Sequence, residues 1–245
     1  MTDWVLFKFT KINKNLLKSL VNSEIYFSRP DGLNDPFDCR VDILKALENA
    51  ISKSSSPSRA RLEKFRGMTG FFEKVQADLK KIGICSFSLK LMKPASSLMW
   101  AHYADNHRGI CLTYRFPESF FYAKADHILG IDKIDYGINP LSDWFIQEAP
   151  KMKSFEEFGI TLIQKALTVK AKPWEYEKEV RILRKIEGVE VIEKHYLKQI
   201  CFGLKTTAND ITLVRKIIDI SGYDVAFCKM KPNAWSDFGF EPSEI

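Results

Sequence analysis

The side chains best suited to chemistry are concentrated between Lys170 and Arg181, where the chain reads Lys-Ala-Lys-Pro-Trp-Glu-Tyr-Glu-Lys-Glu-Val-Arg. Carboxylates alternate with aromatic rings in this segment. Its carboxylates are Glu175, Glu177 and Glu179, and Glu177 and Glu179 are candidate site residues. The segment also supplies three further candidate site residues, namely Lys170, Trp174 and Arg181.

The conformation of this segment decides how its charged groups are presented, and two conformations fit. If the segment is a strand, its two-residue period places Glu177, Glu179 and Arg181 on one face. Tyr176 and Val180 then point into a core. If it is a helix, Glu177 and Arg181 become an i,i+4 ion pair. A solvated face with salt bridges is the alternative to a site, because runs of charge usually form one.

A second cluster lies from residue 99 to residue 109 and reads Met-Trp-Ala-His-Tyr-Ala-Asp-Asn-His-Arg-Gly. It holds two of the chain's four histidines, which makes it unusual for its length. Trp100, Tyr103 and Arg108 of this cluster are candidate site residues. His102 is a further candidate, with a core histidine holding one hydrogen bond as its alternative.

A third cluster, from Ser28 to Asp38, is dense in turn-forming residues. Asn34 and Asp35 precede a proline, which makes this part of the turn more rigid and able to present a carboxamide and a carboxylate. Hydrogen bonds from polar side chains to the local backbone are the alternative explanation for such a segment.

Two serines on an expected strand add to the candidate set. Residues 82–88 read Ile-Gly-Ile-Cys-Ser-Phe-Ser, and strand geometry places Ser86 and Ser88 on one face near the strand's end. Hydroxyls at this position can hold a ribose or a carboxamide, or they can cap the turn that follows.

The composition is that of an ordinary globular protein. Of the 245 residues, 45% are hydrophobic, which is the usual share for a packed core. No apolar run approaches the roughly 18–20 residues needed to cross a bilayer, and the first residues lack the features of a signal peptide. We therefore expect a cytoplasmic protein that makes no membrane contact.

The five cysteines, at positions 39, 85, 111, 201 and 228, are scattered and form no Cys-x-x-Cys pair. This pattern argues against a disulfide framework and against a zinc site. We expect no metal, and buried reduced thiols at the last four positions. The formal net charge of +6 suits an anionic ligand such as a nucleotide or a nucleic acid.

Hydrophobic periodicity and turn residues predict strands at least as numerous as helices. The expected strands are 4–9, 24–27, 82–88, 110–114, 131–136, 189–192, 197–203 and 225–230. The expected helices are 13–21, 41–81 with a break at 54–58, a short helix ending at Tyr103, 155–169, and 209–220 capped by Asn209. Several strands are separated by little more than turns, and no linker splits the chain. We therefore predict the α+β class, as one domain over residues 1–245 with a mixed, mostly antiparallel sheet and flanking helices.

These clusters together resemble the domain-of-unknown-function family 2971, in the family's order and over nearly the whole chain. The most specific pieces are Met-Trp-Ala-His-Tyr at residues 99–103 and Trp-Glu-Tyr-Glu-Lys-Glu-Val-Arg at residues 174–181. Further matching pieces are Tyr-Phe-Ser at 26–28, Asn-Asp-Pro-Phe-Asp at 34–38, Cys-Ser-Phe-Ser at 85–88, Arg-Gly at 108–109 and Lys170. The family is largely uncharacterised, so the resemblance by itself implies no activity.

A more distant resemblance, to ADP-ribosyltransferases, does imply an activity and an ADP-ribosyltransferase-like fold. Those enzymes build their site from a basic residue or histidine on an early strand, a Ser or Tyr on a middle strand, and a late catalytic Glu, often in Glu-x-Glu. This chain offers Lys8 at the first position, where arginine or histidine would be expected. Ser86 or Ser88 stands at the second position, and Glu177-x-Glu179 at the third.

This resemblance implies an enzyme that takes NAD as its substrate and releases nicotinamide through an oxocarbenium-like state, with a role as a toxin or in defence. Glu179 would stabilise that state and hold a ribose hydroxyl. Glu177 would orient or deprotonate the acceptor, a protein or a nucleic acid. The residues implied to bind NAD are Lys8, Arg29, Ser86, Ser88, Trp100, His102, Tyr103 and Arg108.

Two other functions remain open on the sequence. One is a nucleic-acid-binding module or metal-dependent nuclease. In it, the basic helix that begins at about residue 59 would bind the phosphates, and four carboxylates would bind Mg²⁺. Those carboxylates are Asp35, Asp38, Glu177 and Glu179. The other is a non-enzymatic interaction domain, in which His102 and the Glu177–Arg181 pair are structural. Substitution of Glu177, Arg181 or His102 would then reduce stability rather than activity.

Overall fold

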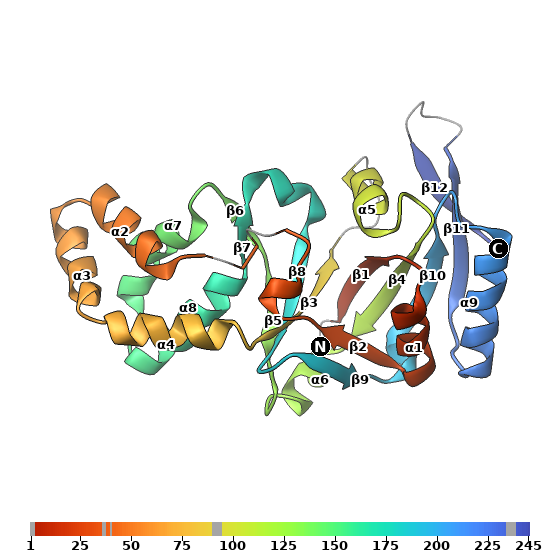
Figure 1. Ribbon diagram of the computed structural model, residues 1–245, viewed down its shortest axis with the longest axis horizontal. Helices are drawn as coiled ribbons and strands as arrows, with labels where there is room; N and C mark the ends of the chain where they lie inside the picture. Colours follow the sequence, from red (N-terminus) through yellow and green to blue (C-terminus); the bar gives the residue numbers. More distant parts are fainter. Residues whose placement is uncertain (1–2, 36–37, 40, 90–94, 234–238) are drawn as a thin grey trace.

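The fold is built on one sheet of eight strands, given by a computed structural model that describes residues 3–35, 38–39, 41–89, 95–233 and 239–245. The strands lie in the order β12-β11-β10-β4-β1-β3-β8-β5 (Figure 1). Neighbours are antiparallel except β10 and β11, which are parallel. Their bounds are β1 (Trp4–Thr10), β3 (Gly83–Ser88), β4 (Ile110–Phe116), β5 (Ile128–Lys133), β8 (Glu179–Arg184), β10 (Leu197–Phe202), β11 (Ala226–Pro232) and β12 (Phe240–Glu244).

Two short strand pairs and a set of helices surround this sheet. β2 (Glu24–Phe27) pairs antiparallel with β9 (Gly188–Val191), and β6 (Asp135–Gly137) pairs parallel with β7 (Val169–Ala171). The α-helices are α1 (Lys14–Asn22), α2 (Ile43–Lys53), α3 (Ser56–Arg66), α4 (Thr69–Leu79), α5 (Ala95–Tyr103), α6 (Glu118–Ala123), α7 (Pro140–Gln147), α8 (Phe155–Leu167) and α9 (Ala208–Ile220). The 3-10 helices are η1 (Pro30–Gly32), η2 (Ala149–Lys151), η3 (Lys172–Glu177) and η4 (Lys194–Tyr196). The predicted α+β class with a mostly antiparallel sheet and flanking helices is confirmed.

Helices α2, α3, α4, α7 and α8 gather at one end of the molecule, on the left of Figure 1, and are called here the helical end. Their apolar side chains form one core together with Ile84 of β3 and Leu183 of β8. Aromatic rings contribute strongly to it: Phe65 and Phe158 are stacked with their centroids 4.7 Å apart. Burial of such rings is what holds this end against the sheet, since each aromatic side chain removes a large apolar area from water.

The other end of the sheet is covered on both faces. On one face α1, α9 and β2 pack over Leu6 of β1 and Phe87 of β3. On the opposite face α5 buries Trp100 against Phe9, with ring centroids 5.2 Å apart. The three buried cysteines of β4, β10 and β11 lie beneath α5. All five cysteines are free and buried, as predicted for four of them.

The sheet divides between β1 and β3, and this division positions the candidate site. The two strands share one registered pair, Phe7 opposite Ser88. At the other end of β3, Ile84 exchanges backbone hydrogen bonds with Ser28, which follows β2, at 2.9 and 2.7 Å. β3 therefore changes partner along its length, from β1 at one end to the residue after β2 at the other. As a result, a space opens between β1 and β3.

The acidic segment is neither of the single elements expected from the sequence. Residues 172–177 form η3, which begins with a proline in its first turn, and Lys178 adopts a left-handed conformation with φ of 46°. Strand β8 begins only at Glu179. The expected strand is therefore present but starts three residues later than Tyr176, and the alternative helix with an i,i+4 pair from Glu177 to Arg181 does not form.

Several other expected boundaries change in the structure. The helix expected over 59–81 is two helices, because α3 ends at Arg66 before Gly67 and α4 starts at Thr69. The strand expected over 131–136 is two strands, β5 and β6. Helix α9 is capped by the hydroxyl of Thr207, not by Asn209. In the described part of the chain, none of the helices combines the length and the apolar character that crossing a bilayer requires.

Candidate functional site

A cavity of about 380 Å³ opens where β1 and β3 diverge. Its lining includes Lys8 of β1, Ser86 and Ser88 of β3, and the glutamates Glu177 and Glu179. β1, β3 and β8 are neighbours in the sheet. Residues from the beginning, the middle and the late part of the sequence thus line one cavity.

Glu179 is held at the cavity wall by a buried arginine. The register pairs Ser88 with Glu179 and Ser86 with Arg181, so all four side chains start on one face of the sheet. Arg181 Nε donates to Glu179 Oε1 at 2.7 Å, and Nη2 donates to Glu179 Oε2 at 3.1 Å. A hydrogen bond from Ser86 also helps to lower the pKa of Glu179. This carboxylate is therefore fixed in orientation.

Lys170 and Asp38 extend the ion pair into a buried cluster. Lys170 Nζ lies 2.5 Å from Glu177 Oε2, 3.0 Å from Glu179 Oε2 and 3.3 Å from Asp38 Oδ2. Arg181 Nη2 lies 2.6 Å from Asp38 Oδ2. Each of these five residues is at most 7% exposed. The cluster joins the loop after η1, β7, η3 and β8.

The pKa values in this cluster reflect burial opposed by opposite charges. For Glu179, burial raises the pKa, but Arg181 and Lys170 outweigh burial and bring it down to about 2. For Glu177, burial raises the pKa more than Lys170 and Tyr103 lower it. The pKa values of these two neighbouring carboxyls therefore shift in opposite directions. Glu179 stays ionised, and Glu177 takes up a proton more readily than an ordinary glutamate.

Glu177 has a second set of partners at the cavity surface. The Tyr103 hydroxyl, from the end of α5, donates to Glu177 Oε1, and Asn34 Nδ2 donates to the Tyr103 oxygen at 3.1 Å. Burial, and next the Glu177 carboxylate, raise the pKa of Tyr103. The Ser88 hydroxyl donates to the Glu177 backbone carbonyl at 2.7 Å. These contacts hold Glu177 beside the cavity although it lies outside the strand.

Lys8 reaches the cavity from the other face of the sheet. Phe7 shares a face with Ser88, so Lys8 points the opposite way. Its ammonium lies 5.1 Å from the centroid of the Phe87 ring and donates to the Ser86 carbonyl at 3.0 Å. Lys8 therefore occupies the gap between β1 and β3 and satisfies a backbone carbonyl that the sheet leaves without a strand partner.

Four other residues that were predicted to contact the ligand do not line the cavity. Trp100 is 1% exposed and packs against Phe9 in the core, so its ring is not available for stacking. Arg29 is exposed, with its Nε 3.1 Å from Glu187 Oε2. Arg108 is exposed on the turn after α5. His102 is exposed too, and its Nδ1 lies 2.9 Å from the Tyr176 hydroxyl.

Two further candidates lie next to the cluster. The Trp174 ring has Lys170 Nζ 5.1 Å from its centroid, which is a cation–π distance. Asp35 lines a second cavity of about 260 Å³, whose lining also includes Asp38 and Lys170. Pro36 and Phe37, from the same motif, lie outside the described residues.

Sequence reasoning missed three partners of the site. Asp38 was expected only as a metal ligand, yet it pairs with Arg181 and Lys170. Cys39 Sγ lies 2.7 Å from Arg181 Nη1, and burial raises the pKa of its thiol to about 12. The Tyr136 hydroxyl accepts a hydrogen bond from the Glu179 backbone N–H at 2.8 Å. The Asn-Asp-Pro-Phe-Asp motif was a signal for Asp38, whereas nothing local marks Tyr136.

The same contacts bear on the nuclease alternative. The oxygens of Asp38, Glu177 and Glu179 already face Lys170 or Arg181. Mg²⁺ would have to compete with these buried cations for hard oxygen ligands. Among the described residues, no group of three histidine, cysteine, aspartate or glutamate side chains is placed to hold a metal ion.

The family model for a protein of unknown function (DUF2971) matches residues 99–182. No curated protein and no solved structure matches the chain significantly. The matched segment contains Tyr103, Lys170, Glu177, Glu179 and Arg181, whereas Lys8 and the two serines of β3 precede it. The chain therefore carries the DUF2971 pattern over residues 99–182, and the predicted resemblance to that family is confirmed for this segment. The expected extent over nearly the whole chain is not confirmed, because the motif pieces at 26–28, 34–38 and 85–88 precede the matched segment.

Proposed function

We propose that this protein is an ADP-ribosyltransferase-like enzyme that takes NAD as its substrate and transfers ADP-ribose with release of nicotinamide. One observation carries the proposal: three neighbouring strands bring Lys8, the serines of β3 and Glu179 to one cavity. This is the early, middle and late arrangement that the distant sequence resemblance implies. A cavity of about 380 Å³ is within the usual range for sites that hold small molecules and cofactors.

The charge of the buried cluster suits the reaction. Three carboxylates, of Asp38, Glu177 and Glu179, face two cations, of Lys170 and Arg181. With every group ionised, the cluster has one negative charge in excess. Cleavage of the bond between ribose C1′ and the nicotinamide nitrogen develops positive charge on the ribose, and fixed negative charge in a low-dielectric wall stabilises it.

The two glutamates divide the work according to their surroundings. Glu179, with its pKa of about 2, is a permanent anion and is held by Arg181, so it can stabilise the developing cation without reorientation. Glu177, with its raised pKa, is the better proton acceptor. It takes the proton of the acceptor nucleophile while the acceptor's bond to C1′ forms. Two carboxyls whose environments shift their pKa values in opposite directions typically have different acid–base roles in a site.

Tyr103 and Asn34 position the proton acceptor. Because the Tyr103 hydroxyl donates to Glu177 Oε1 and accepts from Asn34, the carboxylate is directed by α5 and by the loop after η1. Lys8 has two further N–H donors beside the one given to the Ser86 carbonyl. Those donors can meet an anionic part of the substrate in the gap between β1 and β3.

Transfer of label from radiolabelled NAD to the proteins and nucleic acids of a cell lysate tests the proposal. The wild-type protein is expected to label an acceptor, and Glu177→Gln, matched for melting temperature, to lose transfer while keeping slow release of nicotinamide to water. Labelling by the Glu177→Gln variant at the wild-type rate would contradict the role of this residue. A wild-type protein that labels nothing and releases no nicotinamide would contradict the proposed function as a whole.

A further inference from the structure

We propose that the helical end is a binding surface for single-stranded nucleic acid, with an apolar hollow for a base and lysines for the phosphates. This surface lies away from the cavity between β1 and β3 and is independent of the function proposed for that cavity. The observations that carry it are the distribution of charge, the exposure of aromatic and aliphatic side chains, and one hollow that combines both.

The positive charge of the chain is concentrated at this end. Residues 43–81, which form α2, α3 and α4, contain nine lysines and arginines against four aspartates and glutamates. This excess of five nearly accounts for the net charge of +6 of the whole chain. A surface that concentrates one sign of charge attracts a polyanion, and neutralised phosphates release their counterions.

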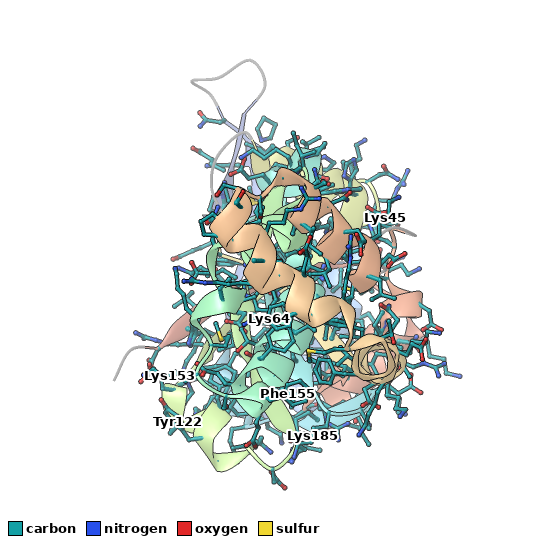
Figure 2. All side chains as sticks on the ribbon, turned by 90° about the vertical axis from the view of Figure 1, so that its left-hand side faces the viewer. Lys45, Lys64, Tyr122, Lys153, Phe155 and Lys185 are labelled. Atoms are coloured by element: carbon teal, nitrogen blue, oxygen red, sulfur yellow. The ribbon has the colours of Figure 1, made fainter. Side chains whose placement is uncertain are left out.

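Several cations at the helical end, from α3, α4 and later parts of the chain, are free to meet a phosphate. Within the described part of the chain, Lys64, Lys80, Lys153 and Lys185 are exposed and form no ion pair. Figure 2 looks onto the helical end and shows Lys64, Lys153 and Lys185 on it, with the ring of Phe155 between Lys64 and Lys185 in this view. Phe155 is 58% exposed although it belongs to a helix that packs into the core.

An apolar hollow of about 240 Å³ lies between α4, β5 and α8 on this end. Its walls include Leu129, Ile160 and Ile163, and Ile160 is 53% exposed. Lys81 and Lys185 stand in its lining. Lys81 is paired with Asp78 at 2.8 Å, so Lys185 is the lining cation without a carboxylate partner in the described chain.

The hollow suits a base better than a second helix or a lipid chain. It is small and apolar, it contains the amide of Gln164, and Lys185 in its lining can meet the phosphate next to a bound base. Single-strand binding proteins combine a basic surface with apolar and aromatic platforms in this way. A helix that lies in a membrane surface exposes an apolar face, whereas α3 buries Leu62 and exposes Arg61 and Lys64.

Fluorescence anisotropy of a labelled single-stranded DNA of mixed sequence, titrated from about 50 to about 200 mM salt, tests this surface. The double variant Lys80→Gln/Lys185→Gln is expected to reduce the slope of log K against log salt by about 1.4, since each single-strand phosphate contact contributes about 0.7. The control Lys14→Gln/Lys216→Gln removes equal charge from α1 and α9 at the other end and should leave the slope nearly unchanged. Equal slopes for the two double variants would overturn the placement of the site.

A second variant separates the hollow from the charge. Ile160→Ser is expected to weaken binding about fivefold through lost apolar contact while the salt slope stays as in the wild type. Duplex DNA of the same length should bind more weakly, because its bases are not free to enter the hollow. The proposal is overturned if the wild type gives no anisotropy change at low salt, if duplex binds as tightly as single strand, or if vesicles of anionic lipid compete the DNA away.

Discussion

Replacement of Arg181 by methionine is expected to destabilise the fold by about 3–5 kcal/mol, the usual effect of removing one partner of a buried ion pair. The Arg181 side chain is 0% exposed. Its guanidinium donates to Glu179, to Asp38 and, at 2.7 Å, to the Leu167 carbonyl. Methionine fills a similar volume but donates to none of these oxygens, so two carboxylates lose their main cation in a buried position.

The assay is thermal unfolding followed by circular dichroism. For a chain of this size about 1 kcal/mol shifts the melting temperature by about 2–4 °C, so a decrease of about 10 °C is expected near neutral pH. Arg61→Met on the exposed surface of α3 is the matched control and should change stability by less than about 0.5 kcal/mol.

The pH dependence of this effect gives a second check. Without Arg181, burial dominates the pKa of Glu179 and raises it, so the folded variant can take up a proton that the wild type excludes. The stability deficit of the variant should therefore shrink as the pH falls from about 7 to about 5. A melting temperature within about 2 °C of the wild type, or a stability deficit that grows on acidification, would show that Arg181 does not hold the buried carboxylates.

Three further predictions concern the residues around the cavity. Tyr103→Phe removes a donor that lowers the pKa of Glu177, so the acid limb of ADP-ribose transfer to the acceptor should move to higher pH, measured as a pH–rate profile of labelling; an unmoved limb would contradict the contact. The pKa of Glu179 is about 2 in the folded protein, against an ordinary 4.5. This difference contributes about 3 kcal/mol to the free energy of unfolding above pH 4.5, and the contribution is lost as the pH falls toward 2. The free energy of unfolding, measured with urea, should fall more steeply with decreasing pH for the wild type than for Glu179→Gln. The raised pKa of Glu177 changes stability with pH in the opposite direction, but it does so in both proteins. Trp100→Ala should lower the free energy of unfolding by about 3–5 kcal/mol in a thermal melt. Nicotinamide release per folded molecule should be unchanged, whereas loss of a ring that stacks on the substrate would reduce it.

Periodicity gave much of the sheet because the strands of this chain carry their own signals. β1, β2, β3, β4 and β10 begin within a residue of the expected positions, since each alternates or concentrates apolar residues between turn formers. The acidic segment was harder. Its division into η3 and β8 depends on the left-handed Lys178 and on partners distant in sequence, such as Tyr136. Neither is visible in the local pattern.

The candidate site shows a similar limit. Residue type and spacing identified Glu177, Glu179, Arg181 and Lys170 as members of one constellation, and they do lie together. The same reasoning placed Trp100 at a ligand, because a pattern of aromatic residues does not say which ring faces the core. Burial of that ring depends on how α5 packs over β1, which is a tertiary property.

Release of nicotinamide from NAD by the purified wild-type protein, measured beside Glu179→Gln, decides whether the cavity between β1 and β3 is an NAD-cleaving site. The glutamine variant keeps the shape of the carboxylate but removes its charge, and it is compared under conditions where both proteins are fully folded. We expect release by the wild type and a decrease of at least about 100-fold in the variant, because removal of one preorganised electrostatic contact typically costs this much. Equal release by the two proteins, or none by the wild type with lysate supplied as acceptor, would contradict the account.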